Sequence, residues 1–189
     1  APSASITTSG IEVDAAGNLF VADPYSGMVH RVDAATKIIT TVAGNGSYGT
    51  SGDGGPALSA GFEYPGGLGR DAAGNLFIPD LDRVRRVDHA SGIITTVAGS
   101  GLGYGGDGGP ATSALLNYPS DVAIAANSDI YIADSENQRV RRVRNGTITT
   151  VAGNGFETGS IDGPGGDSRD DLGDGGQARQ ASVSYPWSV

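Results

Sequence analysis

The sequence contains no cysteine, a single methionine, a single tryptophan and two histidines among 189 residues. Without thiols the chain can form neither disulfide bonds nor thiolate metal sites. It has no run approaching the ~20 apolar residues of a membrane-spanning helix, so we expect no membrane insertion. The net charge of −9 repels phosphate backbones over most of the surface, so we also expect no nucleic-acid partner.

Glycine, by contrast, is abundant, with 32 residues, and it marks an internal repeat. A passage of about 55 residues is written three times, a period typical of propellers and other repeat arrays. The loop GDGGPA occupies residues 52–57 and 106–111, and its variant GDGGQA occupies 173–178. We place the repeats, within a single domain over 1–189, at approximately 10–64, 65–118 and 119–185, with an acidic glycine-rich insertion at about 156–172.

Each copy predicts four short antiparallel strands. In the third copy, residues 129–134 (DIYIAD) are apolar on both faces, which is typical of a strand covered on both sides. Residues 139–143 and 147–153 flank Asn145-Gly146, a strong hairpin signal because both central residues of a type I′ turn need positive φ. Residues 118–124 supply the fourth strand. Such sheets bury both faces only by packing around an axis, so we predict an all-β fold, a β-propeller with three blades per chain.

The second copy departs from the other two at one corner. It is two residues shorter between Asp80 and Val84. Pro79 also removes a backbone donor near the end of its strand, which is tolerated only where the ladder is ending or exposed. We therefore expect an irregular corner in the second blade.

Three features of the repeat resemble a known family. They are the Asp-x-x-Gly-Asn turn of residues 14–18, the Val-Ala-Asp strand end of residues 21–23, and the Asn-x-Arg-Val return of residues 137–140. Together they are similar to the NHL repeat, and the resemblance covers nearly the whole chain. It implies a β-propeller, commonly one with six blades.

Three blades cannot close a ring, so the predicted fold is half of a six-bladed propeller. Its two ends expose sheet faces built for burial, with Ile11, Val13 and Val189 as candidate interface residues. Two copies joined head to tail would complete the ring. The alternatives are a fragment of a longer propeller and an open filament, which would suit a structural subunit of an extracellular fibre.

The sequence offers little for an enzyme of this architecture. The resemblance extends to propeller lyases and hydrolases, and these enzymes tend to need a metal or a histidine cluster on the axis. Only His30, on a mid-blade strand, and His89, in a turn, are present, and neither is predicted where strands converge. We therefore assign no catalytic residue, no cofactor-binding residue and no enzymatic activity, and keep a propeller lyase or hydrolase as an alternative.

Arginine supplies 11 of the 12 basic residues, clustered at 83–86 and 139–142. The resemblance admits an RNA-binding basic face, but aspartates such as Asp80, Asp82, Asp88 and Asp134 lie in the same repeats, and we predict ion pairs within each blade. For the aspartates of the Gly-Asp-Gly loops we predict turn capping through nearby backbone N–H groups.

The insertion adds a cluster of carboxylates that is a candidate cation site. Ca²⁺ takes several oxygen ligands, although this spacing matches no EF-hand, and a solvated acidic loop is the alternative reading. The candidate calcium ligands are Asp162, Asp167, Asp170, Asp171 and Asp174.

Aromatic residues recur near the blade starts, at Tyr64, Tyr118, Tyr185 and Trp187. Such platforms can stack a sugar ring at the mouth of a propeller, so a carbohydrate-binding, lectin-like role is a second hypothesis; packing of each tyrosine on its neighbouring proline is the structural alternative.

The sequence thus predicts a non-enzymatic binding or assembly scaffold. Its expected partner is another copy of itself, with a protein or glycan ligand beside it. The lack of cysteine leaves the redox compartment open, but the start at Ala1 without an initiator methionine would suit a processed protein, so we expect an extracellular or periplasmic location.

Overall fold

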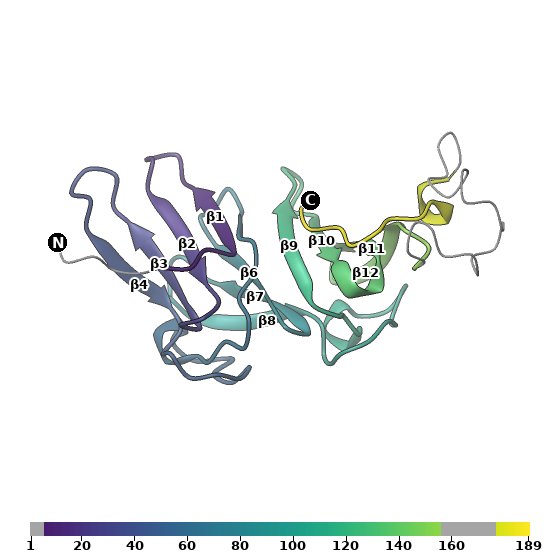
Figure 1. The fold of residues 1–189 in the computed structure, drawn as a ribbon, viewed down its shortest axis with the longest axis horizontal. Coiled ribbons are helices and arrows are strands. Elements are labelled where there is room, and N and C mark those ends of the chain that lie inside the picture. Colours follow the sequence, from purple (N-terminus) through teal and green to yellow (C-terminus); the bar gives the residue numbers. More distant parts are fainter. Residues whose placement is uncertain (1–5, 156–176) are drawn as a thin grey trace.

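The computed structural model describes residues 6–155 and 177–189. It consists of three four-stranded antiparallel sheets that follow one another along the molecule (Figure 1). The predicted all-β fold with three propeller-type blades is confirmed. No helix in the described part of the chain is long and apolar enough to cross a membrane.

The strands occur in chain order within each sheet. The first sheet contains β1 (Gly10–Val13), β2 (Leu19–Asp23), β3 (Met28–Val32) and β4 (Ile39–Ala43). The second contains β5 (Gly69–Arg70), β6 (Leu76–Asp80), β7 (Arg83–Val87) and β8 (Ile94–Ala98). The third contains β9 (Pro119–Ile124), β10 (Ile130–Asp134), β11 (Arg139–Arg144) and β12 (Thr147–Ala152). Short 3₁₀ turns are η1 (Ala57–Ser59), η2 (Ala111–Ser113), η3 (Ser135–Asn137) and η4 (Ala178–Gln180).

Local sequence sets the two features predicted for the strand connections. Asn145 and Gly146 have φ of 49° and 76°, as the hairpin between β11 and β12 requires. In the second sheet β5 has two residues only, and its ladder with β6 ends at Phe77, so Pro79 lies beyond the part of the strand that needs a donor on that side. Leu81, in the corner after Pro79, has φ of 52°. The irregular corner is confirmed.

The hydrophobic core lies between neighbouring sheets rather than inside any one of them. One cluster joins the first sheet to the second through residues such as Val29, Phe62 and Ile94. The next joins the second sheet to the third through Val84, Leu116 and others. Each blade is therefore stable only against a neighbour.

The connection between two blades belongs structurally to both. After β4, Gly44 N–H donates to Ala57 O, which fixes η1 on the first sheet. The same turn then pairs with the edge of the second sheet, where Ala57 N–H donates to Gly92 O and Ile94 N–H donates to Gly55 O. The GDGGPA loop is thus a clamp that covers the outer strand of the blade that follows it.

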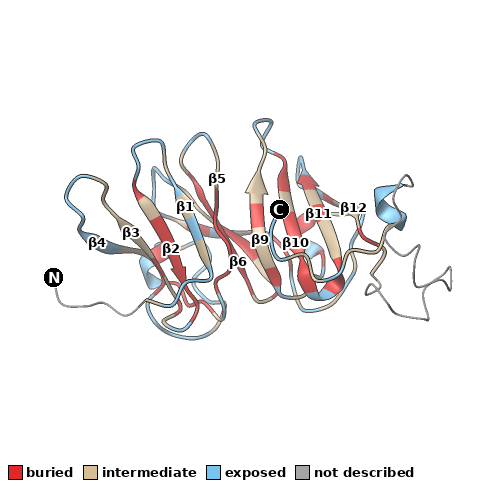
Figure 2. Cartoon of the chain, turned by 45° about the horizontal axis from the view of Figure 1, so that its top comes forward, coloured by how far each residue is buried: buried red, intermediate tan, exposed pale blue. Residues whose placement is uncertain are grey.

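The outer strand of the first blade, β4, has no such clamp over it among the described residues. Ile39 aligns with Ile94 and Ile148, which are both 0% exposed, but Ile39 itself is 38% exposed. In Figure 2, β1 has no buried residue and β4 has one, Ala43, whereas β6 and β10 are almost entirely buried.

We predict that these equivalent isoleucines contribute unequally to stability. Ile94→Ala should lower the free energy of unfolding by about 2–5 kcal/mol, because it empties a packed site. Ile39→Ala, at an incompletely covered site, should cost only about 1 kcal/mol. Urea denaturation of a dilute sample measures both, and equal losses would show that the clamp does not govern burial.

Candidate functional site

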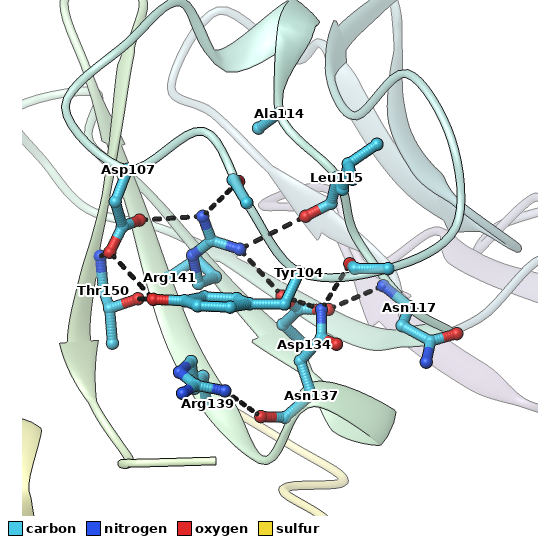
Figure 3. Close-up of polar contacts among 12 residues, drawn as sticks. Tyr104, Asp107, Ala114, Leu115, Asn117, Asp134, Asn137, Arg139, Arg141 and Thr150 are labelled. Atoms are coloured by element: carbon cyan, nitrogen blue, oxygen red, sulfur yellow. Dashed lines mark hydrogen bonds and ion pairs between the residues drawn. The ribbon is translucent and has the colours of Figure 1, made fainter.

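Two buried arginines hold the clamps in place. Arg141 is fully buried, and its guanidinium donates to Asp107 Oδ1 at 2.7 Å and to Asp134 Oδ2 at 3.0 Å. The carbonyl oxygens of Leu115 and Gly105 accept further bonds (Figure 3). The guanidinium thereby ties strand β11 both to its own blade and to the preceding connection.

Arg85 repeats this arrangement one blade earlier. It is 0% exposed and donates to Asp53 Oδ1 at 2.8 Å, to Gly61 O at 2.7 Å and to Ser51 O at 2.8 Å. Its guanidinium also lies 5.0 Å from the ring centroid of Phe62. The second and third blades therefore each contain a buried arginine that binds an aspartate and carbonyl groups of the preceding connection.

The predicted ion pairs within each blade are confirmed. Arg83 pairs with Asp82, Arg86 with Asp88 and Arg141 with Asp134, while Arg85 lies 4.0 Å from Asp80. Arg85 and Arg141 pair in addition with Asp53 and Asp107 of the preceding connection, which the sequence did not predict.

The turn capping predicted for the Gly-Asp-Gly aspartates was wrong for Asp53 and Asp107, and Asp174 lies outside the described residues. Asp53 Oδ2 accepts the backbone N–H of Thr96 at 2.7 Å, and Asp107 Oδ2 accepts that of Thr150 at 3.0 Å. These partners lie in the next blade rather than in the local turn. Asp53 and Asp107 bond the next blade instead of capping their own turn, because Arg85 and Arg141 of that blade offer them a charged donor as well.

The surroundings lower the pKa of Asp107 but raise the pKa values of Asp80 and Asp134. Burial raises the pKa of Asp107, but hydrogen bonds from Thr150 and the charge of Arg141 outweigh it and hold this pKa below its usual value. Burial dominates at Asp80 and raises its pKa to about 6, and it raises the pKa of Asp134 as well. Asp80 Oδ2 accepts no hydrogen bond, which agrees with the higher pKa.

The same buried acids position the aromatic residues at the blade starts. Asp80 Oδ1 accepts the N–H groups of Glu63 and Tyr64, at 2.9 and 2.8 Å. One blade later, Asp134 Oδ1 accepts Asn117 N–H at 2.8 Å, directly before Tyr118. Asp80 at the end of β6 and Asp134 at the end of β10 therefore fix the loops that carry Tyr64 and Tyr118.

These loops and the C-terminal segment surround an aromatic pocket of about 430 Å³. We define it by Tyr64, Tyr118 and Trp187, which are 50, 48 and 76% exposed. Ser9, Ser120, Ser135 and Glu136 add hydroxyl groups and one carboxylate. Three of the four predicted aromatic residues thus meet in one pocket, whereas Tyr185 does not line it.

Tyr104, an aromatic residue that the sequence did not single out, lies over two arginines of the third blade. The Arg139 guanidinium is 3.8 Å from the ring centroid of Tyr104, and that of Arg141 is 5.1 Å away (Figure 3). Its hydroxyl lies 3.4 Å from Asp107 Oδ2. The Tyr104 ring therefore covers the guanidinium groups of Arg139 and Arg141.

The histidines stand apart from one another. His30 takes the position of Arg85 and Arg141, and its Nδ1 lies 3.3 Å from Thr41 Oγ1. His89 donates its backbone N–H to Asn75 in a turn. Within residues 6–155 and 177–189 no group of three or more His, Asp or Glu side chains is close enough to hold a metal ion. The candidate calcium ligands between Asp162 and Asp174 lie outside the described residues.

The residues predicted for the interface lie at the two ends of the blade series. Ile11 and Val13, on β1, are each 56% exposed, and Val189 is 38% exposed. Ile11 aligns with Leu68 and Val122, which are 5 and 2% exposed inside the two cores. A core position is therefore open at the first blade.

Comparison with known proteins identifies the repeat. The NHL repeat model matches residues 116–143, so the third copy carries an NHL repeat and the resemblance is confirmed. Human Teneurin-4 (Homo sapiens) is 35% identical over 104 residues, which make up 47% of this chain and 4% of Teneurin-4.

Solved structures share the fold at low sequence identity. An auxiliary nutrient binding protein from Bacteroides thetaiotaomicron is 19% identical with a TM-score of 0.61, over 95% of this chain and 42% of its own. A gluconolactonase from Xanthomonas campestris is 17% identical with a TM-score of 0.56, over 78% of this chain and 48% of its own. The chain spans less than half the length of each of these relatives. They include binding proteins and an enzyme, and at these identities they show the fold alone.

We predict that the buried arginine network is the most sensitive polar element of the fold. Arg141→Met should lower the free energy of unfolding by about 3–5 kcal/mol, because it strands the buried carboxylate of Asp134. Arg86→Met, whose side chain and partner Asp88 are each about a third exposed, should cost no more than about 1 kcal/mol. Chemical denaturation compares the two, and a mild effect of Arg141→Met would refute the assigned role.

Asp80 gives the stability a pH dependence of known sign. Its folded-state pKa of about 6 exceeds the value of ~3.9 in an unfolded chain, so the folded state binds the proton more tightly. Lowering the pH from 7 to 5 should therefore add about 1 kcal/mol to the free energy of unfolding through this group. Asp80→Asn keeps an acceptor for Tyr64 N–H and should lose this increment. Urea titrations at both pH values test it, and identical pH dependence in the two proteins would contradict it.

Proposed function

We propose that this protein is a non-enzymatic binding and assembly module, half of a six-bladed NHL-type propeller, that closes head to tail with a second copy. One observation carries the proposal. The positions that form the core between consecutive blades occur once more, divided between the two ends of the blade series, where most of them are half-buried or exposed, although Val21 is buried.

The first half of this divided core is the N-terminal open face. Its members align with core residues of the second and third blades, and Ile39 shows the difference most clearly, since its counterparts are fully buried. The N-terminal open face consists of Ile11, Leu19, Val21, Val32 and Ile39.

The second half is the C-terminal open face. Ala57 and Ala111 are 2 and 1% exposed under the following blade, but their equivalent Ala178 is exposed. Val183 is half-buried, whereas its equivalents Phe62 and Leu116 are fully buried. The C-terminal open face consists of Val140, Ala152, Ala178, Ala181 and Val183.

The two faces fit each other because each already has the backbone geometry of the internal joints. Gly153 N–H donates to Ala178 O at 3.0 Å, as Gly44 N–H donates to Ala57 O at 2.9 Å. Gln177, before η4, has φ and ψ of −75° and 129°, close to the −60° and 133° of Pro56 before η1. On the other face, Lys37, at φ 59°, aligns with Gly92 at φ 69°. Lys37 O would then accept Ala178 N–H from the second copy, as Gly92 O accepts Ala57 N–H.

The non-enzymatic part of the proposal rests on the side chains. The central arginines of the second and third blades, Arg85 and Arg141, are engaged with aspartates, and the two histidines lie apart. The fold shared with the nutrient binding protein is compatible with a binding role, whereas the fold shared with the gluconolactonase keeps a hydrolase or lyase as the alternative. An extracellular or periplasmic location stays part of the proposal. If the rotation between copies does not close the ring, the same joint builds a fibre.

Carbohydrate binding is a second candidate function, favoured by the aromatic pocket. Tyr64, Tyr118 and Trp187 offer exposed ring faces around one hollow, and Glu136 offers an exposed carboxylate that can accept hydroxyl groups. Sugar rings stack on such faces through their C–H groups, while their hydroxyls bond polar neighbours.

We predict that the purified chain forms a concentration-dependent species of twice its mass of 18.9 kDa. Ile39→Glu should shift it to monomer, because the joint would bury an unpaired carboxylate. Ile38→Glu is the matched control, since Ile38 is 59% exposed and aligns with the exposed Thr147. Light scattering over a dilution series measures the mass; a monomer at every concentration overturns the assembly proposal.

We predict that glycan binding, if the pocket serves it, depends on the aromatic rings. Trp187→Ala should lower glycan-array signal about tenfold or more, as the loss of a stacking platform implies. Tyr25→Ala, a 70% exposed tyrosine outside the pocket, should leave the signal unchanged. A signal unaffected by either change would remove the pocket from consideration.

A further inference from the structure

The aromatic pocket, lined by Tyr64, Tyr118 and Trp187, carries charge of one sign only. Among the described residues that line it, Glu136 bears a carboxylate, and no lysine, arginine or histidine is present. Glu136 is exposed, and its backbone N–H donates to Asn117 O at 3.2 Å, which places it next to the loop that carries Tyr118. The pocket thus combines three aromatic rings with one negative charge.

The serine hydroxyls of the pocket already donate to the protein. Ser9 Oγ donates to Pro65 O at 2.6 Å. Ser120 Oγ and Ser135 Oγ donate to Pro186 O, at 2.9 and 2.6 Å. A hydroxyl has one proton, so these serines present acceptor lone pairs to a ligand. The lining therefore suits a ligand that donates hydrogen bonds or carries positive charge.

The backbone holds the rings in place before any ligand arrives. Tyr118 N–H donates to Leu81 O at 2.9 Å. Both residues have positive φ, 47° and 52°, a conformation that costs energy for residues with a β carbon. Trp187 follows Pro186, whose carbonyl accepts the two serine bonds just described. A preformed site loses less conformational entropy when it binds a ligand.

Aromatic faces attract cations, because the π system places negative charge above and below the ring. We propose that the aromatic pocket binds an organic ammonium group, with the rings of Tyr64, Tyr118 and Trp187 as its walls and Glu136 as its counter-ion. The net charge of −9 attracts such ligands to the protein and repels acidic ones. The volume of about 430 Å³ admits the cationic end of a small ligand.

This inference is independent of assembly, and it narrows the carbohydrate hypothesis. A neutral sugar needs both donors and acceptors around its hydroxyl groups, whereas the serines supply acceptors. A sugar with a protonated amine adds a charge for Glu136 and the rings, and in that form the inference rests on the second proposed function. A quaternary ammonium compound offers the same charge without a sugar ring, so the ligand chemistry has two sources that an experiment can separate.

The test is isothermal titration calorimetry of the full chain with paired probes of similar shape. Choline is compared with the alcohol in which a tert-butyl group replaces its trimethylammonium group. Glucosamine, protonated in mildly acidic buffer, is compared with glucose. We expect the charged member of at least one pair to bind about tenfold more tightly than its neutral partner.

Three variants assign the effect to the pocket. Trp187→Ala should weaken binding of the charged probe about tenfold, through loss of a cation–π contact. Glu136→Gln should weaken it about threefold or more and leave the neutral partner unaffected. Glu63→Gln is the matched control, because it removes the same charge from a residue that does not line the pocket, and it should change neither affinity. Trp187 and Glu136 are exposed, so we expect both of their variants to fold.

The outcomes are distinct. Tighter binding of choline, of glucosamine or of both than of the neutral partners supports the ammonium site and identifies its source. Equal binding within each pair overturns it, and if glucose and glucosamine bind equally the carbohydrate hypothesis still stands. No binding of any probe overturns the site, and an equal loss in Glu63→Gln and Glu136→Gln does so as well, because the field of the whole protein would then explain the preference. Assembly is read from the mass in separate samples, so none of these results decides it.

Discussion

The constraint on which the structure depends is that each four-stranded sheet is apolar on both faces and has no cover of its own. A sheet of this kind is stable only when something packs on each side. In this chain the cover comes from the neighbouring blade together with the connection that joins them. The clamp of residues 52–57 belongs in sequence to the first repeat, but it completes the outer strand of the second. Stability is therefore a property of joints, and a terminal blade is an incomplete unit.

The buried arginines follow from this arrangement. A guanidinium at 0% exposure needs several acceptors, and neither Arg85 nor Arg141 could find them within one sheet. The preceding connection supplies carbonyl oxygens and an aspartate. Arginine suits this task better than lysine because its planar fork reaches two loops at once. In the first blade, where the described residues include no preceding connection, the position holds His30, which is satisfied by Thr41 on the adjacent strand.

Most of the fold could be predicted because its signals are local. The repeat period, the Asn145-Gly146 turn and the alternation of residues 129–134 each report on neighbouring residues. The aromatic pocket was partly predictable for the same reason, since Tyr64 and Tyr118 stand at the repeated Tyr-Pro position. The partners of Asp53 and Asp107 were not predictable, because the bonds to Thr96 and Thr150 span 43 residues and depend on how blades pack. The role of Tyr104 was not predictable, because no tyrosine at the equivalent position of the first connection marks it as part of the repeat.

The aromatic pocket is built from two parts that are held independently. Tyr64 and Tyr118 are positioned from within the blades, because Asp80 Oδ1 and the Leu81 carbonyl accept their backbone N–H groups. Trp187 belongs to residues 185–189, which contact β9 through Ser120 and Asp121. The tyrosines are therefore fixed by the same contacts that organise the blades, whereas the position of the indole depends on the bonds of the C-terminal segment.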